Sequence, residues 1–320
     1  MSKSLASLSL DLDNKWSYMK THGDAGWEAL PSYLDIIVPR VLKMLKEEKL
    51  TITFFIVGLD AAQPASQPVL KTIADAGHEI GNHSFKHEPW LHLYSDAELE
   101  QEMTNAETAI QAATGQMPKG FRGPGFSFSP QLLDLLARRG YQYDASTFPT
   151  FLGPLARMYY FAKSSLSSEQ SLQRKALFGS AKEGFRPLKP YRWQTHSGPL
   201  TEIPVTTMPI ARVPIHLSYV LYLATFSRAL ALFYWNVALT LCRLTGTQPS
   251  LLLHPLDFLG QEDCPELAFF PAMQTPAAPK LEVARKVLQA FAQHFQVVPM
   301  KEHAQSLTAA PPMPLPTLAS

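Results

Sequence analysis

Cysteine is scarce in this sequence, and neither sign of charge is in excess. Two of the 320 residues are cysteines, Cys242 and Cys264, and neither belongs to a CxxC pattern. A secreted chain of this size more often carries a clear set of paired cysteines, so we expect a reducing compartment. Lys and Arg total 28 and Asp and Glu total 27, which gives a formal charge of +1. Because no positive field attracts polyanions, we expect no nucleic-acid partner.

An apolar run of signal-peptide length is also absent before the polar residues DLDNKW at 11–16. This absence predicts a cytoplasmic protein. Hydrophobic residues make up 46% of the chain, which is enough to build a large core. Residues 306–320 are rich in proline and are predicted to be an extended or disordered tail.

Between the two ends, segments typical of strands and of helices alternate. Strands are expected at 8–13, 51–58, 78–85, 119–125, 141–146, 200–207, 248–255 and 296–300, and helices at 34–49, 68–77, 95–115, 129–140 and 280–295. This alternation predicts an α/β barrel, in which functional residues gather at the carboxyl ends of the strands. Between about residues 150 and 200 the alternation stops, and we expect a long insertion or cap there.

Two carboxylates lie on the first expected strand, LSLDLDNKW at 8–16. Side chains alternate along a strand, so Asp11 and Asp13 share the face opposite Leu10. If that face is buried, the pair needs a metal ion, a basic side chain or a wet cleft. The alternative is an edge strand with its polar face in solvent.

Two histidines follow the third expected strand in GNHSFKHEPW at 81–90. His83 and His87 are four residues apart, a spacing that places two imidazoles on one face of a helical turn. With a carboxylate from the first strand they would form a set that suits zinc or a similar divalent ion. The alternative is a pair of surface histidines.

Three further polar positions follow expected strands. Arg122 precedes the turn ending at Gly125 and could hold a carboxylate by a bidentate contact, beside an unhindered backbone N–H. Asp144 ends a strand and suits a turn or a site equally well. His254 ends an apolar strand, with Asp257 three residues later, and a histidine there can serve as a general acid.

The order of these motifs resembles the polysaccharide deacetylases, the NodB-homology enzymes of carbohydrate esterase family 4. The resemblance runs from residue 8 to about 258. It implies a distorted (β/α)7-type barrel with a long insertion, formed by a single catalytic domain over residues 1–305. It also implies metal-assisted hydrolysis of an N-acyl group, such as acetyl, on an amino sugar.

The resemblance also assigns roles to single residues. The metal ligands would be Asp13, His83 and His87, holding zinc or else cobalt, nickel or manganese. Asp11 would be the general base, oriented by Arg122. The remaining roles are an oxyanion donor at the Gly125 N–H, a general acid at His254, and a partner for this acid at either Asp144 or Asp257.

The sequence departs from the family pattern at several points. The usual Asp-Asp pair is Asp-Leu-Asp at residues 11–13, a variant similar to the branch that acts on lipid-linked sugars. Gly125 stands where an aromatic residue is common, which suggests a wider substrate cleft. The tryptophan expected after the motif of Asp144 is not evident, which puts the role of this aspartate in question.

The most hydrophobic part of the chain is residues 214–246. Arg228 interrupts it, and a membrane span here would separate two strands that the barrel needs, so we expect no span. A buried helical hairpin and an interfacial element remain as alternatives. The interfacial alternative predicts peripheral contact with the inner face of the membrane and a lipid-linked amino sugar as substrate. Two other functions stay open: a deformylase of a polyprenyl-phosphate-linked formamido sugar, and a non-catalytic sugar-binding barrel at the membrane.

Overall fold

A computed structural model describes residues 3–152, 184–307 and 310–315 of the chain. The predicted insertion at about 150–200 lies outside the described residues from 153 to 183, and the predicted tail lies outside them at 308–309 and 316–320. Within residues 184–200, where irregular structure was expected, the chain instead forms one strand of the main sheet, Tyr191–Thr195, and the start of a second, Gly198–Glu202, which overlaps the strand expected at 200–207.

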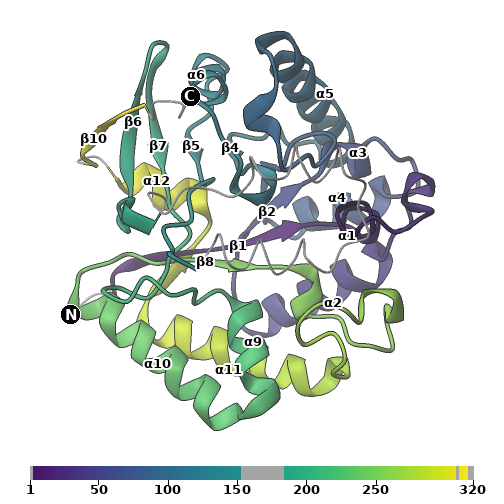
Figure 1. Ribbon diagram of the computed structural model, residues 1–320, viewed down its shortest axis with the longest axis vertical. Helices are drawn as coiled ribbons and strands as arrows, with labels where there is room; N and C mark the ends of the chain where they lie inside the picture. Colours follow the sequence, from purple (N-terminus) through teal and green to yellow (C-terminus); the bar gives the residue numbers. More distant parts are fainter. Residues whose placement is uncertain (1–2, 153–183, 308–309, 316–320) are drawn as a thin grey trace.

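A mainly parallel sheet forms the centre of the molecule (Figure 1). Its order is β10-β6-β7-β5-β4-β3-β2-β1-β8, and β9 pairs with the start of β1. Among the described strands, β6 and β7 pair in antiparallel fashion and the other pairs are parallel. The strands are β1 Leu5–Leu12, β2 Thr53–Ile56, β3 Glu79–Asn82, β4 Gly120–Phe121, β5 Tyr143–Asp144, β6 Tyr191–Thr195, β7 Gly198–Glu202, β8 Ser250–Leu253, β9 Gln296–Val298 and β10 Pro312–Pro314.

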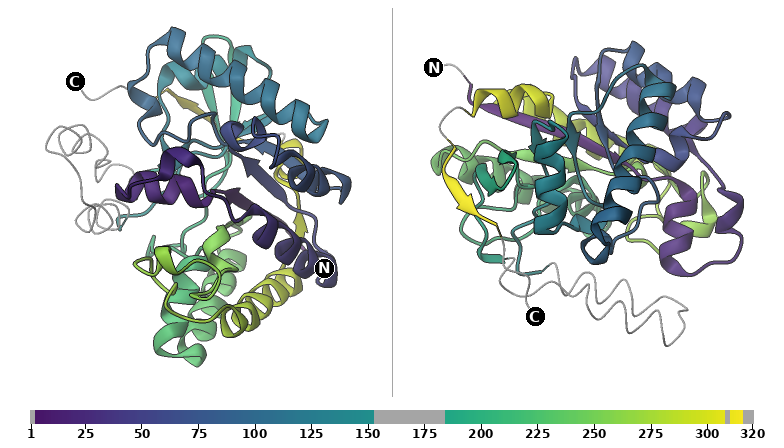
Figure 2. Two further views of the ribbon diagram at one scale, coloured as in Figure 1. Left: turned by 90° about the vertical axis from the view of Figure 1, so that its right-hand side faces the viewer. Right: turned by 90° about the horizontal axis from the view of Figure 1, so that it is seen from above.

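Helices cover the outside of this sheet, as parallel strands require for their crossovers (Figure 2). They are α1 Lys15–His22, α2 Leu34–Glu47, α3 Gly58–Ala61, α4 Gln67–Asp75, α5 Asp96–Thr114, α6 Pro130–Arg138, α9 Leu217–Phe226, α10 Arg228–Leu244, α11 Ala277–His294 and α12 Met300–Ser306. Their ends follow local chemistry: Ser95 and Glu98 form a capping box before α5, and Gly115 ends it in the left-handed region.

The gap between β7 and β8 is spanned by the extended residues that follow β7. The N–H of Ile203 donates to the carbonyl of Asp144, and the N–H of Thr206 donates to the carbonyl of Ser250, 3.0 Å away, at the start of β8. The wall therefore continues from β5 to β8, while β6 and β10 extend the sheet outside it. The predicted α/β fold with a distorted barrel is confirmed.

Strand β1 lies in the middle of this sheet, between β2 and β8. Its leucines pack into the main core with helices such as α2, while Ser9 and Asp11 face the opposite side and are also buried. The alternative of a solvent-exposed edge strand is therefore wrong. The polar face of β1 lies instead inside the barrel, where a buried arginine meets it.

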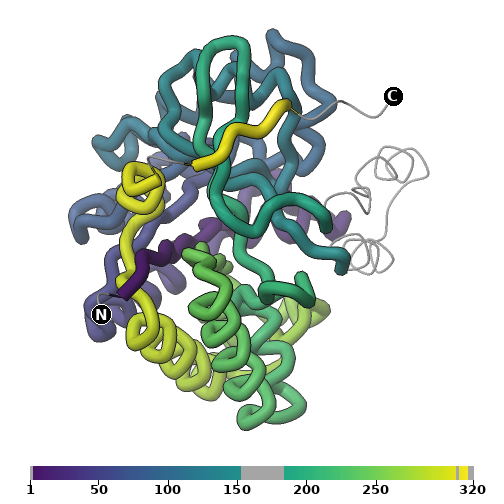
Figure 3. Tube along the Cα trace, turned by 90° about the vertical axis from the view of Figure 1, so that its left-hand side faces the viewer, coloured from purple at the N-terminus to yellow at the C-terminus, as the bar shows by residue number. Residues whose placement is uncertain are grey.

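Helices α9 and α10 form a hairpin within residues 214–246, where a buried hairpin and an interfacial element were the two alternatives. They pack on α11 at one side of the molecule (Figure 3). The break between them is at Ser227, whose hydroxyl accepts the N–H of Leu230 as the N-cap of α10. No described helix is both long enough and apolar enough to cross a membrane.

Candidate metal centre and catalytic groups

The strand register brings the polar residues of four motifs to one end of the barrel. The last residues of β1 to β5 are paired with their neighbours: Leu12 with Ile56, Ile56 with Asn82, Asn82 with Phe121, and Phe121 with Asp144. Asp13, His83 and Arg122 each come directly after this layer of paired residues. Segments far apart in the sequence therefore deliver their side chains to one level of the barrel.

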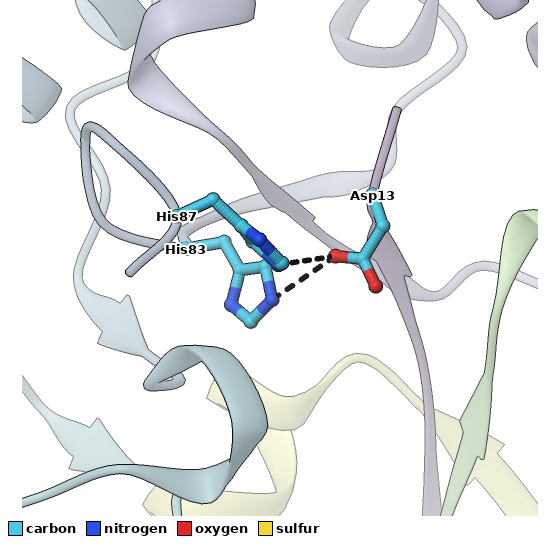
Figure 4. A group of neighbouring side chains, drawn as sticks. All are labelled: Asp13, His83 and His87. Carbon is cyan, nitrogen blue, oxygen red and sulfur yellow. Dashed lines mark ion pairs between the residues drawn. The ribbon is translucent and has the colours of Figure 1, made fainter. Parts of the chain in front are cut away.

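Asp13, His83 and His87 converge on one another (Figure 4). Oδ1 of Asp13 lies 3.2 Å from Nε2 of His83 and 2.9 Å from Nε2 of His87. One ligand atom from each residue lies within 4.8 Å of the other two, and in the part of the chain that the structure describes this is the one group of at least three His, Cys, Asp or Glu residues at such spacing. The predicted metal ligands are thus brought together.

The two histidines reach this position from a loop, which corrects the expectation of a helical turn. His83 follows β3, and the backbone takes positive φ at Ser84 (61°) and at His87 (53°), a conformation that side chains other than glycine seldom adopt. Nδ1 of His83 lies 2.7 Å from the carbonyl of Arg122 and donates to it, which turns Nε2 toward Asp13. The loop and the neighbouring strand end together fix the ring.

The electrostatics of the three residues fit a cation. Burial opposes the charged form of Asp13, but His87 and His83 outweigh it and hold the pKa of Asp13 well below its usual value. Burial likewise opposes protonation of His83, yet Asp11 and Asp13 raise its pKa. Oδ1 of Asp13 is buried and has no aligned hydrogen-bond donor. One carboxylate oxygen and two imidazole nitrogens that leave open positions are a donor set that suits Zn²⁺ or a similar divalent ion.

A layer of polar side chains supports Asp13, and sequence reasoning missed it. The hydroxyl of Tyr33 donates to the carbonyl of Asp13 over 2.6 Å. Oδ1 of Asp60 accepts Nδ2 of Asn14 and Nε1 of Trp16, both at 2.8 Å, and burial raises the pKa of Asp60 to about 7. The run DNKW at 13–16 signals a helix start with Asn14 as N-cap, but its partner on α3 lies 46 residues away.

Asp11 has a separate partner. Nη1 of Arg122 donates to Oδ1 of Asp11 over 2.6 Å and to the hydroxyl of Ser9 over 2.8 Å. Nε of Arg122 donates to the carbonyl of Ala145, and the guanidinium carbon lies 4.4 Å from the ring centre of Phe55. The predicted contact of Arg122 with a carboxylate is present, but it uses one nitrogen and one oxygen and is not bidentate. Asp11 is therefore held by Arg122 while Asp13 faces the two histidines.

Gly125 lies in the turn after Arg122 and packs beside the histidine loop. Its φ is 58°, and a Cβ built on it would lie 3.2 Å from Cβ of Pro89, two residues after His87. The same turn is tied to the end of β5, because the N–H of Gly123 donates to the hydroxyl of Ser146 over 2.8 Å. The position of Gly125 is compatible with the predicted oxyanion role, which stays a prediction.

His254 follows β8 at the level of Asp11. The register pairs Leu10 of β1 with Leu253 of β8, so the next residue on each strand is Asp11 and His254. Oδ2 of Asp257 accepts the backbone N–H of His254 over 2.8 Å. The hydroxyl of Ser218, in the first turn of α9, lies 3.2 Å from Nδ1 of His254 and also bonds Asp257. Burial raises the pKa of Asp257, and His254 and Ser218 oppose this shift.

Asp144 has other partners than His254. Its Oδ1 accepts the hydroxyl of Ser146 over 2.6 Å, and its carboxyl hydrogen-bonds Glu202, its register partner on β7. Burial and Asp144 raise the pKa of Glu202 well above its usual value. Burial of both groups, and the proximity of Asp144 to Glu202, therefore favour the uncharged forms of these two carboxyls. Of the two residues considered as partners of His254, Asp257 accepts its backbone N–H, whereas the ring itself contacts Ser218.

His216 is a second histidine beside His254 that sequence reasoning did not single out. The two ring centres are 5.6 Å apart, His216 is 8% exposed, and its Nδ1 has no hydrogen-bond partner among the described residues. Burial, and then the proximity of His254, hold the pKa of His216 well below its usual value. It therefore enters the site as a neutral imidazole.

Comparison with known families places part of this chain among the polysaccharide deacetylases. Residues 24–143 match the family model described as polysaccharide deacetylase. The match includes His83, His87, Arg122 and Gly125, whereas Asp11 and the other site residues at either end of the barrel lie outside it.

Curated relatives match over a similar part of the chain. A peptidoglycan deacetylase of Helicobacter pylori is 33% identical over 112 residues, which are 35% of this chain and 37% of that protein. The peptidoglycan-N-acetylmuramic acid deacetylase PdaA of Bacillus subtilis is 35% identical over 106 residues, 32% of this chain and 39% of that protein. The match thus spans less than half the length of these relatives.

Solved structures extend the likeness of fold to the whole chain. A Mycobacterium smegmatis protein assigned to the polysaccharide deacetylases superposes with a TM-score of 0.64 at 21% identity, covering 100% of this chain and 96% of that one. At this identity the likeness concerns the fold. It includes the segments of β1 and β8, which the family model leaves out.

Proposed function

We propose that this chain, of which residues 24–143 match the polysaccharide deacetylase model, hydrolyses an N-acyl group, in the first place acetyl, from an amino sugar with the help of a divalent metal ion. The observation that carries this proposal is that two neighbouring aspartates have different partners. Asp13 faces His83 and His87, while Asp11 is held apart by Arg122. A metal-dependent hydrolase needs side chains that bind the metal and a base that does not bind it. We assign the first role to Asp13 and the second to Asp11.

The ligands Asp13, His83 and His87 would hold zinc, with cobalt, nickel or manganese as alternatives. A divalent ion bound there supplies Lewis acidity toward the acyl carbonyl and lowers the pKa of water. Asp11 accepts the proton of the attacking water, and Arg122 fixes the orientation of its carboxylate.

His254 lies on the opposite side of Asp11 from the metal ligands and donates the proton to the leaving amine. Water adds to the acyl carbon, the carbon–nitrogen bond breaks, and the products are a carboxylate and the free amino sugar. The backbone N–H of Gly125 would donate to the developing oxyanion. Asp257 and Ser218 orient His254 for this transfer.

The substrate that we propose is lipid-linked and is presented at the inner face of the membrane to a cytoplasmic protein. This proposal is supported by the Asp-Leu-Asp variant at residues 11–13 and by the apolar character of residues 214–246. A formyl group would undergo the same hydrolysis, so formamido sugars on a polyprenyl phosphate belong in the test.

The experiment compares the wild-type chain with Asp11→Asn and with Asp35→Asn, a control at an exposed aspartate on α2. Each protein is incubated with N-acetyl and N-formyl amino sugars, free and polyprenyl-linked, and amine release is followed by mass spectrometry. We expect Asp11→Asn to retain its metal, measured by elemental analysis, and to lose turnover, while Asp35→Asn keeps both.

Amine release by Asp11→Asn at the wild-type rate would refute the assignment of the base. Metal binding without release of amine from any sugar would favour a non-catalytic sugar-binding barrel over an enzyme.

A further inference from the structure

The hairpin of α9 and α10 exposes large apolar side chains on its outer side. Tyr222 and Phe226 near the end of α9 are 43% and 72% exposed, and Leu230 and Phe233 near the start of α10 are 53% and 67% exposed. Further along α10, Leu244 is 77% exposed. On a helix, positions 230, 233, 237 and 244 lie on one face. A contiguous apolar stripe of this kind marks a surface that binds something.

The inner side of the same hairpin is firmly packed, so the exposed stripe is not a sign of a loose element. Trp235 is fully buried, and its Nε1 donates to the carbonyl of Val287 on α11 over 3.1 Å. Ala231, Ala238 and Cys242 are also buried in the main core. Figure 3 shows α9 and α10 (green) side by side against α11 (yellow). The hairpin therefore presents a rigid apolar surface.

The charges of this part of the chain are of one sign. Residues 203–256 contain no Asp or Glu, and their only formal charges are Arg212, Arg228 and Arg243. The acid that neighbours the hairpin from another element is Glu282 of α11, which pairs with Arg228 at 3.1 Å. An apolar stripe on helices that carry two arginines and no carboxylate complements an anionic lipid surface.

The hairpin is also joined directly to the site. Ser218, in the first turn of α9, contacts His254, and Phe226 is the last residue of the same helix. At about 1.5 Å per residue, the eight steps from Ser218 to Phe226 separate the residue that contacts His254 from the apolar stripe by about 12 Å along the helix. A sugar whose lipid remains in a bilayer has to be reached by a site that lies close to the bilayer surface.

We propose that α9 and α10 dock this protein on a membrane surface that contains anionic lipid, with Phe226, Leu230 and Phe233 entering the headgroup region. The inference deepens the proposed function, on which it rests for the identity of the substrate, because it names the surface that brings the site to a lipid-linked sugar. Docking itself needs no turnover and is tested separately.

The test is co-sedimentation with vesicles of phosphatidylcholine alone and of phosphatidylcholine with phosphatidylglycerol. We expect the wild-type chain to bind the anionic vesicles, and the double variant Phe226→Gln, Phe233→Gln to bind them about tenfold or more weakly, because the free energy of burying two aromatic rings is lost. The matched control is Leu93→Gln with Met117→Gln, which removes two exposed apolar side chains that lie elsewhere. This control should bind like the wild type.

A second variant tests the electrostatic part. Arg228→Gln with Arg243→Gln should weaken binding to anionic vesicles by about fivefold for each arginine. Circular dichroism checks that the variants are folded, and light scattering checks for dimers. Equal sedimentation of the wild type with and without vesicles would overturn the proposal. A dimer that the double phenylalanine variant abolishes, without any vesicle binding, would also overturn it and assign the stripe to a second copy of the chain.

Docking and catalysis fail in different ways. If Asp11→Asn docks like the wild type and neither protein releases amine from any sugar, the docking surface stands and the proposed function falls. If the wild type releases amine from free sugars but binds no vesicle, the proposed function stands and the docking surface falls.

Discussion

Removal of the Arg122 guanidinium should destabilise the protein far more than removal of any surface arginine. Arg122 is fully buried, and its Nη1 is the charged partner of the buried Asp11. The substitution Arg122→Met keeps much of the side-chain volume but leaves the carboxylate of Asp11 without its counter-charge. Breaking a buried ion pair in this way costs about 3–5 kcal/mol. The turn that carries Gly125 begins directly after Arg122, so activity should fall as well.

The measurement is urea unfolding of the metal-free protein, so that metal affinity does not enter the free energy of unfolding. The control is Arg138→Met, because Arg138 and its partner Glu100 are both more than 40% exposed. An exposed pair of this kind contributes about 0–1 kcal/mol. The double variant Arg122→Met, Asp11→Asn removes both charges, and it should be less destabilised than the sum of the single variants by about 1–3 kcal/mol.

The reasoning would be refuted if Arg122→Met were no more destabilising than Arg138→Met. It would also be refuted if the effects of the two buried substitutions simply added, because Arg122 would then act through its contacts with Ser9 and Ala145 and not through Asp11.

Two more predictions concern His303 and His254. His303 is fully buried, and burial lowers its pKa from 6.5 to about 4. As the pH falls from 6.5 toward 4, this histidine therefore binds a proton in the unfolded chain but stays neutral in the folded chain. Stability should therefore drop by about 2 kcal/mol more between pH 7 and pH 5 in the wild type than in His303→Gln, measured by urea unfolding. The hydroxyl of Ser218 contacts the ring of His254, so Ser218→Ala should lower kcat about tenfold with KM and metal content unchanged. Ser218→Thr keeps the hydroxyl and should restore kcat. An unchanged kcat in Ser218→Ala would show that Ser218 does not orient His254.

The grouping of Asp13, His83 and His87 was predictable from sequence because Asp13 and His83 each follow the end of a strand. An apolar strand that ends in a polar residue, as β1 ends before Asp13 and β3 before His83, places that residue at the carboxyl end of the sheet. The parallel register then aligns residues that are 70 positions apart. The spacing of His83 and His87 was a correct guide to their proximity but a wrong guide to the backbone, since positive φ at Ser84 and His87 replaces the helical turn.

The partners of these residues were not predictable, because they depend on contacts between distant segments. Glu202 looked like part of an ordinary strand, and only the pairing of β5 with β7 places it against Asp144. Ser218 lies in a strongly hydrophobic segment, and nothing in the residues around it indicates that it contacts His254, 36 residues later. The polar residues that hold a site in place carry no pattern of their own.

The pairing of Asp144 with Glu202 distinguishes Asp144 from Asp257, the two residues that the family likeness left as alternative partners of His254. A partner for the acid has to contact His254, and Asp144 instead contacts Ser146, whose hydroxyl accepts the N–H of Gly123. Gly123 follows Arg122, so Asp144 is linked through Ser146 to the turn beside Asp11, while Asp257 accepts the backbone N–H of His254. Each of the two proposed catalytic groups, Asp11 and His254, therefore has its own buried carboxyl group nearby, and a change at one should leave the orientation of the other intact.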